Sequence, residues 1–181
     1  MPETVAIIGA GPLGRWLALA AARAGFSVLL EDVMPHNLHH AQEWLRRELG
    51  QDALAEIKLV STIEDAVRKA DLVIDCVPDE LESKLEILWL LDRMAPPRTV
   101  LATPTTRLSI TDLAACTYRP EKCVAIATEA SSLTGNAGAG GSGREILLLT
   151  SAKTSHESVE LVERFWRGLG FLPVFAGEDG V

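Results

Sequence analysis

The fold is decided by the stretch Val5-Ala6-Ile7-Ile8-Gly9-Ala10-Gly11-Pro12-Leu13-Gly14, in which an apolar run leads directly into glycines spaced GxGxxG. The apolar run predicts a short strand over residues 5–8, which the glycines end. Apolar side chains then recur at helical spacing from Leu13 to Ala20, and Gly25 is a suitable stop for that helix. The chain therefore opens with a strand, a tight turn and a helix.

The rest of the chain repeats this alternation. Further strands are expected over residues 27–31, 58–61, 71–77, 99–103, 123–127, 146–150 and 172–175. Helices are expected over residues 35–49, 63–69, 80–94, 110–116 and 154–168, the first of them ended by Gly50. This alternation predicts an α/β fold, a Rossmann-type doubly wound and mostly parallel sheet. The 181 residues, 48% of them hydrophobic, are enough for a single domain over residues 1–181.

The composition argues against several classes of partner and site. The formal net charge is −8, with 25 acidic against 17 basic residues, so neither nucleic acid nor an anionic membrane surface is favoured as a partner. The three cysteines are odd in number and lack CxxC spacing, so we expect neither a disulfide framework nor a metal site. No apolar run approaches the roughly 20 residues of a membrane span. The expectation is a soluble, cytoplasmic protein.

One glycine-rich segment, residues 135–143, interrupts the alternation and has few side chains able to pack. We expect it to be a mobile loop. It superficially resembles a phosphate-binding P-loop, but that motif needs a lysine followed by serine or threonine, and Ser142, Gly143 and Arg144 stand there instead.

The glycine turn has the features of a dinucleotide site. Gly9 allows the tight turn, Gly11 allows a pyrophosphate to approach the backbone, and Gly14 lets the helix lie close to the strand. The helix that begins at Pro12 and Leu13 offers free N–H groups and the positive end of its dipole to phosphates. Asp32, at the end of the second strand and beside Glu31, is placed to hold the adenosine ribose hydroxyls.

These features predict an NAD(H) site. The residues after Asp32 include no arginine that could pair with a 2′-phosphate, so NAD is favoured over NADP. The alternative is a glycine turn kept only for structure, in a fold that has lost its cofactor.

Longer motifs add a family resemblance that covers nearly the whole chain. Residues 70–79, ADLVIDCVPD, are similar to the strand "ADLVIEAVPE" of the L-3-hydroxyacyl-CoA dehydrogenases. Residues 101–110, LATPTTRLSI, resemble that family's "LATNTSSLSI", and Arg119-Pro120-Glu121-Lys122 resembles its "RPER". The sequence is therefore similar to the N-terminal NAD-binding domain of this family, which implies an oxidoreductase of fatty acid metabolism.

The resemblance also implies a cofactor pocket beyond the glycine turn. Val77 and Pro78 lie near the end of the matched segment, and Asp79 and Lys84 fall where the family lines its nicotinamide and ribose pocket. Thr105 falls on the loop above the nicotinamide ring. Without the resemblance, Lys84 would be a solvated helix lysine.

The catalytic positions depart from the family. Its proton-transfer histidine stands in "HFFNP" after the strand that follows "RPER", and Ala127 occupies that position here. Thr106 keeps a hydroxyl where the family has a substrate-binding serine, while Arg107 is foreign to that site. Glu145 resembles the glutamate that partners the histidine, and is otherwise a carboxylate at a strand edge. Thr106 and Glu145 are therefore the candidate catalytic residues, and Glu129 is a further candidate base.

Other candidate bases are less suitable. The four histidines, which are His36, His39, His40 and His156, are expected on helix surfaces.

The family's helical C-terminal domain is absent from this sequence, which is either a naturally single domain or an excised piece. The open cleft would leave apolar surface uncovered, so we expect a homo-oligomer or a partner chain to cover it.

Three functions remain open at this stage. The first is a dehydrogenase of 3-hydroxyacyl-CoA type that binds an acyl-CoA and uses another group as its base. The second is a non-catalytic NAD(H) sensor or regulatory subunit. The third is a reductase for a non-CoA substrate.

Overall fold

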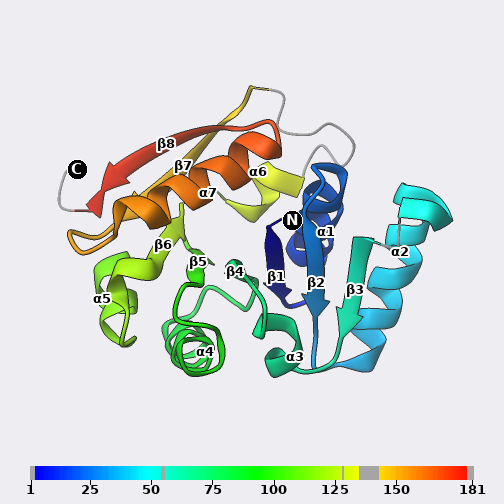
Figure 1. Cartoon of the computed structure of the whole chain (residues 1–181), viewed down its shortest axis with the longest axis horizontal. Coiled ribbons are helices and arrows are strands. Elements are labelled where there is room, and N and C mark those ends of the chain that lie inside the picture. The colour runs from blue at the N-terminus through cyan, green and yellow to red at the C-terminus, as the bar shows by residue number, and fades with distance from the viewer. Residues whose placement is uncertain (1–2, 54–55, 128, 135–142, 179–181) are drawn as a thin grey trace.

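Figure 1 shows the computed structural model of the chain, which describes residues 3–53, 56–127, 129–134 and 143–178. The strands are β1 (Thr4–Ile8), β2 (Ser27–Glu31), β3 (Ile57–Val60), β4 (Leu72–Asp75), β5 (Val100–Pro104), β6 (Cys123–Ile126), β7 (Glu145–Thr150) and β8 (Leu172–Gly177). The helices are α1 (Pro12–Arg23), α2 (Pro35–Ala53), α3 (Ile63–Val67), α4 (Leu81–Met94), α5 (Ile110–Ala115), α6 (Ala130–Thr134) and α7 (His156–Gly168), with a 3-10 helix η2 (Pro120–Lys122).

The described strands form one eight-stranded sheet in the order β3-β2-β1-β4-β5-β6-β7-β8. All neighbouring strands pair in parallel except β6 and β7, which are antiparallel. The strand order reverses between β1 and β4, and the carboxyl ends of these two strands lie side by side at that reversal. The predicted mostly parallel, doubly wound sheet is therefore confirmed, and its switch point is where such sheets bind ligands.

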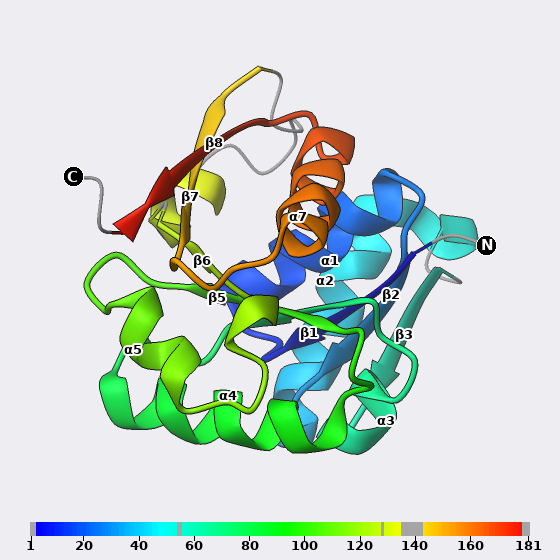
Figure 2. The same cartoon turned by 60° about the vertical axis from the view of Figure 1, so that its left-hand side comes forward.

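Two apolar cores lie on opposite faces of the sheet, because successive side chains of a strand point to opposite sides. In β1, Val5 and Ile7 pack into the core that α1, α2 and α7 cover. Ala6 and Ile8 pack into the second core, which α3, α4 and α5 cover. Figure 2 shows these helices on both sides of the sheet.

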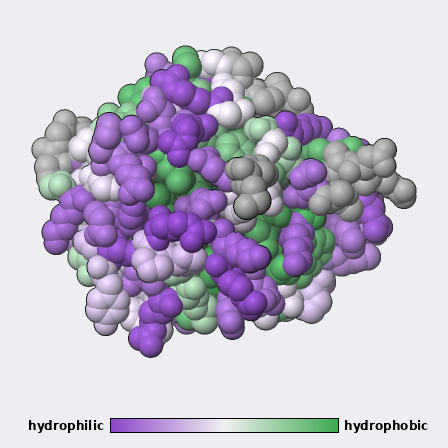
Figure 3. All heavy atoms as spheres, in the orientation of Figure 1, coloured by the Kyte–Doolittle hydropathy of each residue, from purple (hydrophilic) through white to green (hydrophobic). Residues whose placement is uncertain are grey.

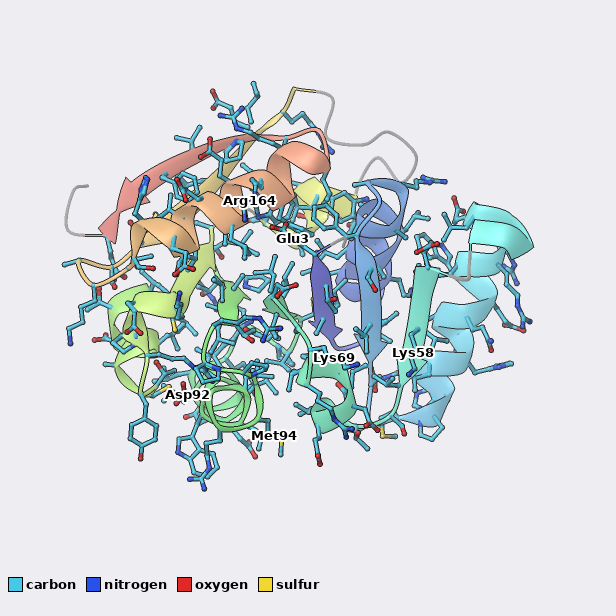
Figure 4. All side chains as sticks on the ribbon, viewed as in Figure 1. Glu3, Lys58, Lys69, Asp92, Met94 and Arg164 are labelled. Carbon is cyan, nitrogen blue, oxygen red and sulfur yellow. The ribbon has the colours of Figure 1, made fainter. Side chains whose placement is uncertain are left out.

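Ion pairs attach the later helices to this framework. The Arg164 guanidinium of α7 lies 2.8 Å from a carboxylate oxygen of Glu3, just before β1, and Figure 4 labels both side chains. Asp92 of α4 is buried and lies 2.7 Å from Nε of Arg119, which precedes η2. The chain around Arg119 and the C-terminal end of α4 are therefore joined, and these contacts are structural.

The structure departs from the sequence prediction in several elements. Gly50 does not end α2, which continues to Ala53. The strand predicted over 71–77 is shorter, because β4 ends at Asp75 and the following residues turn towards α4. The short helix α6 was not predicted. The predicted glycine-rich loop lies outside the described residues except for Gly143, which has a φ of +79°.

The surface in Figure 3 is mostly hydrophilic, with apolar patches between polar side chains. Among the exposed large hydrophobic side chains of the described residues, Tyr118 has the highest exposed fraction, 88%. Within the described ranges, no helix has the length and apolar character that crossing a membrane requires.

Candidate cofactor site at the carboxyl edge of the sheet

The glycine turn between β1 and α1 is tightly packed at two of its three glycines. Gly9 has a φ of +102°, a region that suits glycine, and a Cβ there would lie 3.3 Å from the main-chain oxygen of Cys76. A Cβ on Gly14 would lie only 1.8 Å from the main-chain oxygen of Gly9. The packing roles predicted for Gly9 and Gly14 therefore match the geometry of the turn.

Gly11 differs from the other two glycines because it faces open space. No described atom lies within 4 Å of a Cβ built on Gly11. Gly11 is also the N-cap of α1, where no side chain caps the helix, and Pro12 occupies its first turn. The free N–H groups of that turn therefore face a space with room for an anion, which suits the pyrophosphate of a dinucleotide.

Asp32 lies beside the turn, as the sequence predicts, but its carboxylate already has several protein donors. Oδ2 accepts a hydrogen bond from the Ala10 N–H at 2.9 Å, and Oδ1 accepts one from the Met34 N–H at 2.8 Å. The Asn37 side-chain amide donates to both oxygens at 3.1 Å. Asp32 thus holds the glycine turn against the end of β2, a role that the sequence reasoning missed. Its contact with a ribose stays a prediction.

Glu31, the residue before Asp32, has a buried side chain. It is 1% exposed, and no described group hydrogen-bonds to its Oε1. Its main-chain oxygen accepts the Gly9 N–H at 2.8 Å, so the backbone of Glu31 is joined directly to the turn. Burial, and to a smaller extent the neighbouring Asp32 charge, raise the pKa of the Glu31 carboxyl to about 7.

A pocket of about 410 Å³ opens beside the glycine turn, at the carboxyl ends of β4, β5 and β6. Its lining comprises Leu13, Cys76, Val77, Asp79, Pro104, Thr105, Thr106, Glu129, Ala130 and Ser131. Most of the residues predicted for the nicotinamide end therefore come together. Pro78 lies on a separate pocket of about 320 Å³ between α3 and α4, which Val77 also lines.

Asp79 and the loop after β5 are joined across this pocket. Oδ2 of Asp79 accepts the Thr106 N–H at 3.2 Å, and its main-chain oxygen accepts Nη2 of Arg107 at 2.8 Å. The hydroxyl of Thr105 accepts the N–H groups of Arg107 and Leu108, at 3.3 and 3.0 Å. The loop that carries Thr106 is therefore held by hydrogen bonds to Asp79 and by hydrogen bonds within the loop to Thr105.

Lys84 is buried rather than solvated, so the alternative interpretation of this lysine was wrong. Its ammonium lies 2.6 Å from Oδ1 of Asp75, and the two side chains are 1% and 0% exposed. Burial raises the pKa of the Asp75 carboxyl, and the Lys84 charge opposes that shift. Lys84 does not line the 410 Å³ pocket, so its contact with a cofactor stays a prediction.

The candidate bases predicted from the sequence lie at different distances from the pocket. Ala127 donates its N–H to the main-chain oxygen of Leu147 at 2.9 Å. Glu129 lines the pocket and accepts the Ser131 hydroxyl at 3.2 Å. Glu145, at the start of β7, is exposed and does not line the pocket. The four histidines lie on α2 and α7, away from the pocket lining.

Cys76 is the sulfur-bearing residue of the pocket lining. Its thiol is free, and burial raises its pKa, so the thiol stays protonated. A protonated thiol is a poor nucleophile and a poor metal ligand. Among the described residues, no three of the histidine, cysteine and acidic side chains are grouped so as to hold a metal.

The donor set and free space at this edge fit a dinucleotide. Comparison with known proteins points to the same cofactor. Residues 4–127 match the family described as 3-hydroxyacyl-CoA dehydrogenase, NAD binding domain. A probable 3-hydroxybutyryl-CoA dehydrogenase of Bacillus subtilis is 33% identical over 135 residues, which are 67% of this chain and 47% of that protein.

Two further matches cover nearly the whole chain. A 5-formyl-3-hydroxy-2-methylpyridine 4-carboxylate 5-dehydrogenase of Mesorhizobium japonicum is 29% identical over 99% of this chain and 59% of its own length. The crystal structure of a 3-hydroxyacyl-CoA dehydrogenase from Archaeoglobus fulgidus superposes with a TM-score of 0.81 and 27% identity, covering 97% of this chain and 56% of that one.

The chain thus spans about half to three-fifths of the length of these relatives. It belongs to the 3-hydroxyacyl-CoA dehydrogenase family, and the part of the chain that matches is that family's NAD-binding domain.

Proposed function

We propose that this chain is an NAD(H)-binding oxidoreductase-type protein in which Ala127 replaces the family's proton-transfer histidine. The observation that carries the proposal is the pocket beside the glycine turn, which collects Thr105, Thr106 and Glu129 but no histidine. When bound, NAD⁺ accepts a hydride from a carbon that bears a hydroxyl group, and NADH returns it. The protein must position that carbon and accept or return the proton of the hydroxyl group.

Each part of that task falls to particular residues. The free N–H groups at the start of α1 bind the pyrophosphate, and Asp32 holds the turn that presents them. The Thr106 hydroxyl orients the substrate oxygen from the loop that Asp79 fixes. Glu129 is the carboxylate of the pocket lining that can accept the hydroxyl proton at the β6 end, either directly or through water.

A carboxylate that is not held in place is a weaker base than a positioned histidine. Loss of a positioned base costs about 10²- to 10⁴-fold in rate, so we expect slow turnover. The predicted Glu145 takes no part in this proposal, because it lies outside the pocket lining.

The substrate is either a 3-hydroxyacyl-CoA, which the family suggests, or a smaller molecule. The match to the Mesorhizobium japonicum dehydrogenase over 99% of this chain supports the second candidate, a reaction on a substrate without coenzyme A, and the match to the Archaeoglobus fulgidus enzyme over 97% supports the first. A partner chain or a second copy that covers the pocket stays a prediction.

Calorimetric titration of NAD⁺, NADH and NADPH tests the cofactor site first. NADH should bind more tightly than NADPH. Gly11→Ala should weaken NADH binding without unfolding the protein, because its Cβ enters open space. Gly177→Ala is the matched control, since a Cβ there also meets nothing within 4 Å and lies on the far strand β8.

Spectrophotometric assays of NADH formation then test turnover. Slow oxidation of 3-hydroxybutyryl-CoA or 3-hydroxybutyrate, lost in Gly11→Ala, supports the proposal. Failure of NADH to bind would overturn it. Tight NADH binding without any turnover would favour the alternative of a sensor or regulatory subunit.

A further inference from the structure

Arg107 is not part of the pocket lining, but it directly follows two residues that are, and it has no part in the function proposed so far. It follows Thr105 and Thr106, two residues of the pocket lining, on the loop between β5 and α5. The Thr105 hydroxyl accepts the Arg107 N–H at 3.3 Å, which fixes the backbone from which the arginine side chain extends.

The guanidinium of Arg107 reaches across to the loop after β4. Nη2 donates to the main-chain oxygen of Asp79 at 2.8 Å, and Nε lies 3.9 Å from Oδ2 of the same residue. Asp79 itself lines the pocket. The positive charge is therefore held beside the pocket rather than moving freely in solvent.

This ion pair has little value for stability. The Arg107 side chain is 72% exposed and that of Asp79 is 29% exposed, and pairs of this kind contribute about 0–1 kcal/mol. Of the guanidinium nitrogens, Nη1 has no hydrogen-bond partner within the part of the chain that the structure describes. A planar group with free donors thus remains available for a ligand.

The charges around the pocket indicate which ligand needs such a group. The lining contains the acidic residues Asp79 and Glu129 but neither lysine nor arginine. Taken alone, that lining repels an anionic ligand. Arginine forms paired, charge-assisted hydrogen bonds with carboxylates, so Arg107 can reverse this preference at one edge of the pocket.

We propose that Arg107 binds the carboxylate of a small hydroxy or keto acid whose reacting carbon lies in the 410 Å³ pocket. This inference rests on the proposed function. The substrate class is then a free acid rather than a thioester. A pocket of this size falls within the usual range for small ligands. Arg107 sets substrate specificity. Hydride transfer to or from NAD(H) and the role of Glu129 towards the hydroxyl proton are unchanged.

The test compares an acid with its uncharged ester on the full chain. Acetoacetate and methyl acetoacetate are titrated into the protein with NADH, and binding is followed by saturation-transfer NMR. Arg107→Gln should weaken acetoacetate binding about tenfold or more and leave the ester unchanged, while Arg107→Lys should retain part of the affinity.

A matched control is available at the opposite edge of the sheet. Arg98 is 60% exposed, lies 3.1 Å from Oδ1 of Asp71 and donates to the main-chain oxygen of Lys69. Arg98→Gln removes a similar exposed ion pair and should leave the binding of both probes unchanged.

Three outcomes would overturn the proposal. They are an unchanged acetoacetate affinity in Arg107→Gln, an equal loss for acid and ester, and no acetoacetate binding to the unmodified protein. An equal loss would mean that Arg107 only joins the two loops. The NADH titration without acid reports separately on the proposed function, and the acid titration is repeated without NADH if the cofactor fails to bind.

Discussion

The Asp32 carboxylate accepts a hydrogen bond from the Ala10 N–H at 2.9 Å and thereby joins the end of β2 to the middle of the glycine turn. An acid at this position is expected to hold ribose hydroxyls in NAD-binding folds. Here it also holds the glycine turn against the end of β2.

Asp32→Ala should therefore affect folding as well as cofactor binding. The change leaves the Ala10 and Met34 N–H groups without their acceptor, which should lower the free energy of unfolding by about 1–3 kcal/mol. Urea unfolding without cofactor measures this loss. If Asp32 served the ribose alone, the unfolding midpoint would not move and only NADH affinity would fall.

Gly14→Ala should destabilise the protein much more than Gly11→Ala. The added Cβ would lie 1.8 Å from the Gly9 oxygen, so α1 must move away from β1. Overpacking of this severity should cost about 3 kcal/mol. Thermal unfolding of the two variants side by side checks the difference, and equal melting temperatures would contradict the geometry of the turn.

Glu31 should make the stability of the protein depend on pH. Its pKa in the folded state is about 7, against an ordinary value of 4.5, so the folded state holds a proton that the unfolded chain releases. This contribution to stability is fully present below about pH 4.5 and is lost as the pH rises through about 7.

The loss should amount to at most about 3 kcal/mol, and Glu31→Gln should abolish it because an amide does not titrate. Urea unfolding of both proteins at about pH 5 and about pH 8.5 measures the difference. An equal change of stability with pH in both proteins would show that Glu31 is not the group responsible.

The buried Lys84–Asp75 pair predicts strong coupling between the two residues. Lys84→Met alone should destabilise the protein by about 3–5 kcal/mol, because it leaves the Asp75 carboxylate buried without its partner. Replacing both, as Lys84→Met with Asp75→Leu, should recover much of that loss. A double-mutant cycle by urea unfolding tests this, and additive effects would mean that the pair is not coupled.

Ala127→His should raise the rate of hydride transfer if the proposed function is right. A positioned base is worth about 10²- to 10⁴-fold, and the proposed function takes Ala127, directly after β6, as the position of the family's histidine. The assay is NADH formation from 3-hydroxybutyryl-CoA and 3-hydroxybutyrate. Ala130→His adds a histidine to the exposed part of the pocket lining and serves as the control. Equal rates in all three proteins would mean that Ala127 does not occupy the position of the family's histidine.

The glycine turn could be predicted because its requirements are local. The turn requires a positive φ at residue 9 and the absence of a Cβ at residue 14, and glycine meets both requirements. The alternation of strands and helices is also local, and it was enough to predict the mostly parallel sheet. The antiparallel pairing of β7 with β6 depends on a long-range contact and leaves no comparable pattern.

The contacts between distant residues could not be predicted in the same way. Lys84 on α4 looks like a surface lysine until Asp75 is placed beside it in the interior. The contact between Arg107 and Asp79 joins two loops 28 residues apart, and nothing near either residue indicates it. Gly50 predicts a helix stop because glycine often ends helices, yet α2 continues past it to Ala53.

The protonated thiol of Cys76 has a consequence for the reactivity of this residue. Oxidants and alkylating reagents attack thiolates, and burial keeps this sulfur in its unreactive form beside the glycine turn. Iodoacetamide should therefore alkylate Cys76 slowly in the folded protein and rapidly once the protein is unfolded, so that the rate of alkylation reports whether this edge of the sheet is intact.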